Sequence, residues 1–266
     1  MPLWNIYSFI TLIRPPQAII SGWTMPETLQ FQGILDHSHI DQSVFALRPD
    51  YRALLLVVDG LVPAASDDAS DALLQRAEES ARQALQEQKV EGLPHVAAWR
   101  EAYQAFGAKP NRTRNSLEAL LRRAATGLPR VNQLTDTYNA ISVLHQIPLG
   151  GEDLAHYSGP PRLIRATGKE PFDTAANGET VIEYPEPGEV IWGDDDGVTC
   201  RRWNWRQGRR TQLRDETTTA LFILDVLNPV ATEALTAAAD ELSINLSRLS
   251  PGLGIATRLI SNSALT

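Results

Sequence analysis

Cysteine, positive charge and uninterrupted apolar segments are all scarce in this sequence. Cys200 is the single cysteine among 266 residues. One cysteine excludes an intramolecular disulfide and a thiolate metal cluster, and it is consistent with a reducing cytoplasm. Apolar residues still make up 43% of the chain, which is enough to bury a sizeable core. We therefore expect a soluble, cytoplasmic globular protein that is not associated with a membrane.

Basic residues are outnumbered by acidic ones. The chain has 24 Lys and Arg against 32 Asp and Glu, so its formal net charge is -8. A surface of this sign repels polyanions. Any binding of nucleic acid therefore has to rest on a local basic patch.

Residues 1–24 differ in character from the rest of the chain. Their apolar residues are interrupted by polar residues and a proline pair, so the stretch is too broken to span a bilayer. It also lacks the basic start and the cleavage site of a signal peptide. Because Met25 follows directly, we expect residues 1–24 to be a leader outside the fold and residues 25–266 to form a single domain. The alternative is an arm that docks on a partner through its aromatic residues.

Strand and helix patterns alternate from residue 31 onward. Helical patterns cover residues 71–90, 94–106, 116–123, 231–248 and a segment from Asn132 to the residues before Pro148. Strand patterns cover residues 51–60, 163–166, 180–184, 190–192, 198–202, 211–213 and 220–227, with an extended entry at 45–48.

Two features of this pattern predict tertiary structure. Residues 53–58 are apolar throughout, as a central strand is, and residues 220–227 are mostly apolar like them. We hypothesise that the two segments lie side by side. The strands after Gly151 should be antiparallel, since the sequence at 193–197 is typical of a hairpin turn.

The helix that begins near Asn132 carries three polar residues in one pattern. Asn132, Asp136 and Asn139 are four and three residues apart, so on a helix they share one face. One interpretation is an active face beside a buried stripe, followed by a flexible turn at Gly150 and Gly151. The other is a brace, because Asn and Asp side chains commonly bond to nearby backbone groups.

This stretch also carries a family resemblance. Residues 127–139, GLPRVNQLTDTYN, resemble the arginine-or-proline, asparagine, aspartate, asparagine signature of the B3/4 domain, the tRNA-editing domain of the bacterial phenylalanyl-tRNA synthetase beta chain. Residues 165–172 look like the strand and Gly-Glu turn of that family, although Lys169 separates the glycine from the acid. Residues 188–198 are similar to its strand, acidic hairpin and returning strand. The shared order of these pieces, over residues 94–197, carries the resemblance.

The resemblance implies an α+β domain with mixed and antiparallel sheets flanked by helices. It implies hydrolysis of a mischarged aminoacyl-tRNA ester, here in trans, since the chain carries no adenylate-forming machinery that we can identify. Such a site needs a positioned water, donors for the oxyanion and a selective pocket. Asn132 and Asn139 would orient the pocket loops, and Asp136 would hold a backbone turn. The expected ligand is an aminoacyl-tRNA or an amino-acid-like molecule, and no cofactor or metal is expected.

The chain departs from the family pattern after the hairpin. Residues 199–207 stand where the family has a glycine-rich segment with a pocket glutamate, and they contain no acid. No catalytic residue is therefore carried over. We expect any chemistry in a pocket between the helix at Asn132 and residues 200–206.

The same segment is the local basic patch. Trp203 and Trp205 are interleaved with six arginines, namely Arg201, Arg202, Arg206, Arg209, Arg210 and Arg214. Such a patch suits phosphates and a stacked base, or an amino-acid carboxylate. As a strand, the segment would place Arg202, Asn204 and Arg206 on one face and the tryptophans on the other. The candidate ligand-binding residues are therefore Asn132, Asp136, Asn139, Thr199, Arg202, Asn204 and Arg206.

Other interpretations of these residues stay open. The arginines can instead pair with acidic residues at 183–196 around two buried tryptophans. The protein can also be a non-catalytic module that binds tRNA or a partner, or an enzyme that acts on a free amino acid. Cys200 with His145 or His156 as base, and a metal at His37 and His39, are less favoured.

Overall fold

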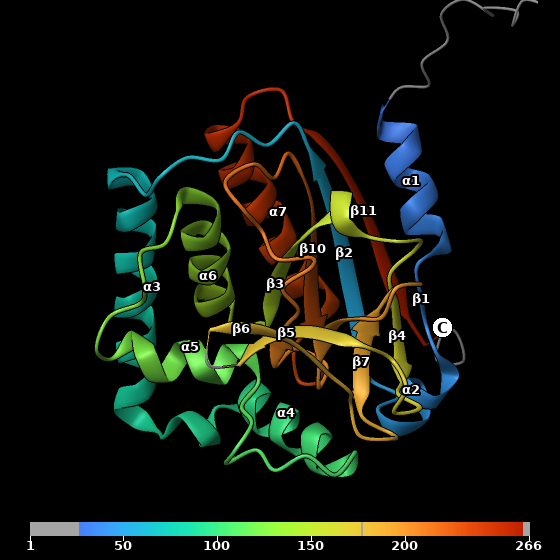
Figure 1. The fold of residues 1–266 in the computed structure, drawn as a ribbon. Coiled ribbons are helices and arrows are strands. Elements are labelled where there is room, and N and C mark those ends of the chain that lie inside the picture. Colours follow the sequence, from blue (N-terminus) through green and yellow to red (C-terminus); the bar gives the residue numbers. More distant parts are fainter. Residues whose placement is uncertain (1–26, 177, 263–266) are drawn as a thin grey trace, which may run out of the picture.

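A computed structural model describes residues 27–176 and 178–262 of this chain. The expected leader, residues 1–24, lies outside the described residues. The central sheet has four strands in the order β11-β2-β10-β3 (Figure 1). β2 (Arg52–Asp59) and β10 (Thr219–Val226) pair antiparallel along their whole length, which confirms that the two apolar strands lie side by side. β11 (Gly254–Ser261) flanks β2, and β3 (Leu149–Asp153) flanks β10.

Both faces of this sheet are covered, because alternate residues of β2 and β10 enter two different cores. One core takes Ala53, Leu55, Val57, Leu221 and Ile223, and the other takes Leu54, Leu56, Val58, Ala220, Phe222 and Leu224. The second core is completed by α6 (Gln133–His145) and α7 (Thr232–Leu249). Burial on both sides explains why these strands read as continuous apolar runs.

The remaining helices form two further layers around the sheet. α3 (Asp68–Glu87) and α5 (Ser116–Ala124) pack on the outer side of α6 around a core of their own (Figure 1). α1 (Glu27–His37), α2 (Gln42–Leu47) and α4 (Pro94–Ala105) contribute to the core on the opposite face of the sheet. Short 3-10 turns cover Val90–Gly92 and Leu154–His156.

A second sheet packs on the same core as α4. Its five strands have the order β1-β4-β7-β8-β9, with the bounds His39–Ile40, Arg162–Arg165, Val190–Gly193, Val198–Arg201 and Arg206–Gln207. β1 and β4 are parallel and the others antiparallel, so the sheet is mixed. β5 (Phe172–Ala176) and β6 (Glu179–Glu183) form a separate hairpin. The α+β fold class and the hairpin at 193–197 are thereby confirmed.

Three local predictions are wrong. Residues 45–48 were expected to be extended, but they lie in and just after α2, whose first turn is capped by the Asp41 carboxylate. Gly150 and Gly151 lie in β3 and not in a turn, because Gly151 packs flat against the Phe222 ring. Residues 211–213 make an isolated bridge to β3 and no strand. No helix among the described residues is long and apolar enough to cross a membrane.

Candidate functional site

A pocket of about 310 Å³ opens at the β3 edge of the central sheet. Its walls come from α5, α6, β3, β10 and the segment 200–207. The lining residues with polar side chains are Ser116, Arg123, Tyr138, Asn139, Glu152, Trp192, Cys200, Trp203, Asn204, Trp205, Arg206, Gln207 and Asp225.

A strained turn brings the segment 200–207 to the pocket. Residues 202–205 form the turn between β8 and β9, and Arg202 and Trp203 have φ values of 48° and 69°. The left-handed region costs a non-glycine residue about 1–2 kcal/mol. Burial of Trp203 offsets this cost, since its indole packs edge-on against Tyr51 and Trp99, at centroid distances of 4.9 and 5.3 Å. The backbone N–H of Trp203 also donates to the carbonyl of Val190 at 2.7 Å.

The turn places Asn204 against the buried carboxyl group of Asp225. The Asn204 amide donates to Oδ2 of Asp225 at 3.2 Å, and the Tyr51 hydroxyl donates to Oδ1 at 2.6 Å. Tyr103 holds Asn204 by donating to its Oδ1 at 2.9 Å. Burial raises the pKa of Asp225 to about 7, although the hydrogen bond from Tyr51 acts in the opposite direction.

A second buried carboxyl group, that of Glu152, lines the same pocket. The Tyr157 hydroxyl donates to its Oε2 and lies 3.4 Å from Oγ1 of Thr199. Burial raises the pKa of Glu152 to about 7, and the hydrogen bond from Tyr157 only partly opposes this. Carboxyl groups with pKa values near neutrality exchange protons readily at physiological pH.

Strand register sets the two acids on one face of the sheet. Glu152 pairs with Leu221 and Gly150 with Ile223, so Glu152, Gly150 and Asp225 point the same way. The two acidic residues lie about 13 Å apart along the strands, at the usual rise per residue. Gly150 lies between them, and a Cβ at this position would have no atom within 4 Å. The missing side chain leaves the floor of the pocket open.

Several polar groups in the pocket lack an ion-pair or a hydrogen-bond partner among the described residues. Within the described residues, neither Glu152 nor Asp225 forms an ion pair, and the Asn139 amide has no hydrogen bond. The buried indole nitrogen of Trp192 likewise lacks an acceptor there with hydrogen-bond geometry. A cationic group with hydrogen-bonding neighbours therefore matches the chemistry of this pocket.

Comparison with known proteins assigns the family. A family model of the B3/4 domain matches residues 98–262, which include every residue that lines the pocket. This chain belongs to the B3/4 domain family.

The solved structures include a similar protein, an N-terminal fragment of the phenylalanyl-tRNA synthetase beta-subunit from Pyrococcus horikoshii. The match has 12% identity and a TM-score of 0.42, and it covers 82% of this chain and 49% of that one. The B3/4 protein described here therefore spans about half the length of that fragment. No curated protein is significantly similar to this chain.

Three of the predicted site residues of this B3/4 protein line the pocket: Asn139, Asn204 and Arg206. Arg206 is also engaged elsewhere, since it donates to the carbonyl of Ala175 at 3.2 Å and lies 3.9 Å from Glu183. Thr199 is buried beside the pocket, behind Tyr157.

Asn132 and Asp136 lie away from the pocket and hold backbone in place. Asn132 is the N-cap of α6 and accepts from the N–H of Thr135 at 2.8 Å. Asp136 is fully buried, and it accepts from the N–H of Val131 and from the hydroxyl of Ser66. Their contacts match the brace interpretation.

Most arginines of the basic patch are paired with acids. Arg201 bonds Glu189 and Glu183, and Arg210 bonds Asp194. Arg202 lies 3.5 Å from Glu189, with its guanidinium 4.5 Å from the Trp205 ring centroid. These contacts match the alternative in which the arginines pair with acidic residues at 183–196. The alternation expected along 202–206 is wrong, because residues 202–205 are a turn and the tryptophans reach the pocket as well.

Sequence reasoning missed Glu152, Asp225 and Gly150. Asp225 interrupts the apolar run of β10, and Glu152 follows the diglycine in β3. The sequence signal was a carboxyl residue inside a strand that the pattern predicts to be buried. Such a residue indicates a functional site, since unpaired acids are rarely buried without a role. The acids of the pocket come from β3 and β10, and not from residues 199–207, where the family resemblance would place a pocket glutamate.

The less favoured candidates do not assemble into sites. Cys200 lines the pocket, but burial raises its pKa well above the usual thiol value. His145 bonds Glu241 and His156 lies 3.3 Å from Asp153, and neither histidine lines the pocket. Among the described residues, no group of three or more His, Cys, Asp or Glu side chains is arranged to hold a metal ion.

Proposed function

We propose that this B3/4 protein binds the aminoacyl end of a charged tRNA in its pocket and hydrolyses the ester in trans. One observation carries the proposal: Glu152 and Asp225 are both buried, face one pocket and have no cationic partner among the described residues. The α-ammonium group of an esterified amino acid is a cation that one of them, Asp225, can hold, while Glu152, about 13 Å away along the strands, stays free for proton transfer. Family membership and the signature at residues 127–139 support the choice of an aminoacyl-tRNA.

An ester suits this pocket better than a free amino acid. A free amino acid adds a carboxylate, which two buried carboxyl groups repel and which calls for an arginine. The arginines expected for that purpose are engaged, Arg202 with Glu189 and Arg206 with the Ala175 carbonyl. This leaves Arg123, an exposed residue of the pocket lining, as the arginine there without a partner among the described residues. An aminoacyl ester keeps the ammonium group and has no free carboxylate. The arginine-lined pocket of a metabolite enzyme is therefore the weaker alternative.

The pocket groups can be given separate roles in hydrolysis. Both carboxylate oxygens of Asp225 are held by hydrogen bonds, which suits a fixed partner for the ammonium group. Glu152 has a pKa of about 7, so it can take the proton of the attacking water and pass it to the leaving ribose oxygen. The Asn139 amide is available to stabilise the oxyanion.

Deacylation of charged tRNA tests the proposal. The purified protein is incubated with phenylalanine-acceptor tRNA that carries labelled tyrosine or labelled phenylalanine, and loss of label is followed. We expect loss of one ester above the buffer rate, and a decrease of about 100-fold or more for Glu152→Gln. Gly150→Leu should also abolish hydrolysis, because the side chain enters the pocket without a backbone clash.

The matched control is Glu101→Gln, which removes an exposed acid on α4 that lines no pocket. It should hydrolyse the ester as the wild type does, and thermal unfolding should show that all three variants are folded. Stability of both esters at the buffer rate in the presence of wild-type protein would refute the hydrolase. Saturable tRNA binding without hydrolysis would instead support the non-catalytic module.

A further inference from the structure

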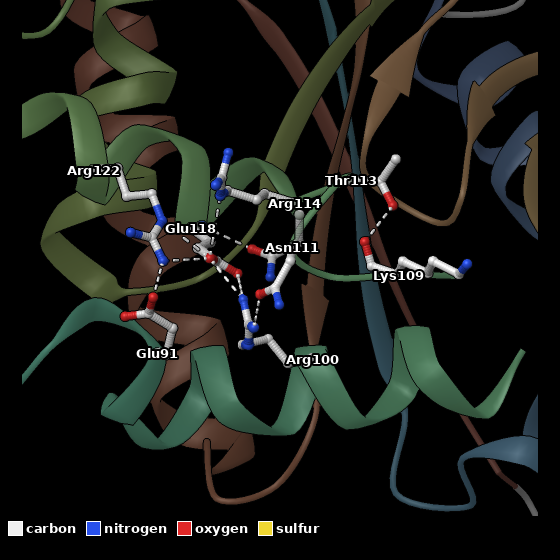
Figure 2. Close-up of polar contacts among 9 residues, drawn as sticks. Glu91, Arg100, Lys109, Asn111, Thr113, Arg114, Glu118 and Arg122 are labelled. Carbon is white, nitrogen blue, oxygen red and sulfur yellow. Dashed lines mark hydrogen bonds and ion pairs between the residues drawn. The ribbon is translucent and has the colours of Figure 1, made fainter. Parts of the chain in front are cut away.

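A cluster of basic residues lies on α5 and on the loop before it. We call it the basic rim, and it consists of Lys109, Arg112, Arg114, Arg122 and Arg123. Figure 2 shows the Glu118 side of the cluster, where Arg100 of α4 joins Arg114 and Arg122 around one carboxylate. Lys109 lies on the segment that connects α4 to α5.

Glu118 is fully buried and does not neutralise the cluster. It lies 2.9 Å from Arg100, 2.9 Å from Arg122 and 3.6 Å from Arg114. Glu91, which pairs with Arg122, is the second acid there. Two carboxylates thus face three guanidinium groups, and the side chain of Arg114 remains 43% exposed.

The other cations of the basic rim are not engaged with any of the described residues. Lys109, Arg112 and Arg123 are exposed, and their side chains form no hydrogen bond or ion pair within the part of the chain that the structure describes. With Arg100 and the two acids included, six positive charges meet two negative ones. In a protein with a net charge of -8, this makes the basic rim a marked local exception.

The basic rim adjoins the pocket. Ser116 and Arg123 line the pocket from α5, and the N–H of Ser116 donates to the carbonyl of Asn204 at 3.0 Å. The loop 109–115 therefore ends beside the strained turn, and Arg123 lies at the pocket itself. A ligand that has its end in the pocket would pass over these cations on leaving it.

We propose that the basic rim binds the phosphate backbone of an RNA strand whose 3′ end enters the pocket. This inference rests on the proposed function and adds the surface that holds the nucleic acid. Unpaired Lys and Arg release counterions from phosphates, whereas the acidic remainder of the protein repels the strand. The basic rim thereby sets both affinity and the direction from which the strand enters.

The salt dependence of RNA binding tests the inference. The probe is uncharged tRNA, and its Kd is measured at several salt concentrations for wild type and for Lys109→Ala/Arg112→Ala, two exposed residues that do not line the pocket. Removal of two phosphate contacts should reduce the slope of log K against log salt by about 1.5, and binding at low salt should be at least 10-fold weaker. The charge-matched control Lys169→Ala/Arg248→Ala removes exposed cations elsewhere and should keep the wild-type slope.

A second measurement separates this inference from the proposed hydrolysis. An amino acid esterified to adenosine has no phosphate backbone, so the variant should hydrolyse it as fast as wild type while losing kcat/KM on charged tRNA. If wild type hydrolyses neither substrate but the slope still falls in the variant, the hydrolase fails and the RNA-binding surface stands. A slope in Lys109→Ala/Arg112→Ala equal to that of wild type would overturn the proposal that the basic rim binds RNA.

Discussion

At the scale of single residues, Glu152 and Asp225 show how burial alters a carboxyl group. Both pKa values are about 7 in the folded chain, although the ordinary values are 4.5 and 3.8. The main cause is loss of water around the charged form. Repulsion from a nearby carboxylate adds to it, from Asp194 for Glu152 and from Glu152 for Asp225. The same burial that makes Glu152 a suitable proton acceptor therefore destabilises the fold at high pH.

The pH dependence of stability follows from Asp225. Its pKa is raised on folding, so the stabilisation is complete below the unfolded value of 3.8 and is lost as pH rises through about 7. Asp225→Asn removes this titration. Between pH 5 and pH 8 the free energy of unfolding of the variant should rise relative to wild type by about 2–3 kcal/mol.

Urea unfolding at the two pH values measures this difference, and any constant cost of the amide cancels from it. Asp240→Asn, an exposed change on α7, serves as the control and should show no such rise. A difference between Asp225→Asn and wild type that is the same at both pH values would contradict the assigned pKa.

At the scale of elements, β3 owes its position and its open pocket face to two adjacent glycines with opposite surroundings. A Cβ at Gly151 would lie 2.7 Å from Cε1 of Phe222, whereas one at Gly150 would meet nothing within 4 Å. Neither glycine has a positive φ, so side chains at both positions are compatible with the backbone. Contacts alone distinguish the two positions.

Alanine at each position tests this reading. Gly151→Ala should lower the free energy of unfolding by about 1–3 kcal/mol, because Phe222 or β3 has to move. Gly150→Ala should change it by less than about 0.5 kcal/mol. Chemical unfolding of the two variants measures both effects, and equal losses of stability would show that β3 does not pack on β10 in this register.

The helix bounds also show which features of the fold the local sequence pattern predicts. Helices 68–87, 94–105 and 116–124 lie within three residues of their predicted bounds, because amphipathic spacing and N-caps depend only on neighbours in sequence. The segment 202–205 misled the same reasoning. Its alternating Arg and Trp residues imitate a strand, whereas burial of Trp203 among distant aromatic residues bends it into a turn.

At the scale of the whole molecule, one sheet joins the cores on its two faces. Each of β2 and β10 sends alternate side chains into both, so neither core can be lost while the strands persist. The helical layer of α3 and α5 reaches the sheet through α6, which contributes residues to its core and to that of the sheet. We therefore propose that residues 25–266 form a single cooperative domain.

Equilibrium unfolding tests this proposal. The tryptophans at 99, 192 and 203 report the core on one face, whereas far-UV circular dichroism is dominated by the helices on the other. Urea transitions followed by fluorescence and by circular dichroism should coincide in midpoint and steepness. Two separated transitions would instead divide the chain into independent units.

Sequence pattern was sufficient for the apolar strands β2 and β10, the main helices, the hairpin at 193–197 and the family signature at 127–139. Each of these rests on residues that are close together in the chain. The position of the pocket's carboxyl groups is different, because Glu152 and Asp225 meet only through the register of β3 and β10.

The tertiary structure also decided which charges are available to a ligand. In sequence, the arginines at 201–210 form the most basic segment, yet acids from β6, from the 184–189 segment and from the 193–197 hairpin pair with Arg201, Arg202 and Arg210. Lys109, Arg112 and Arg123 stay unpaired among the described residues and are left to the basic rim. Ion pairing and desolvation depend on distance and burial in space, which sequence spacing does not encode.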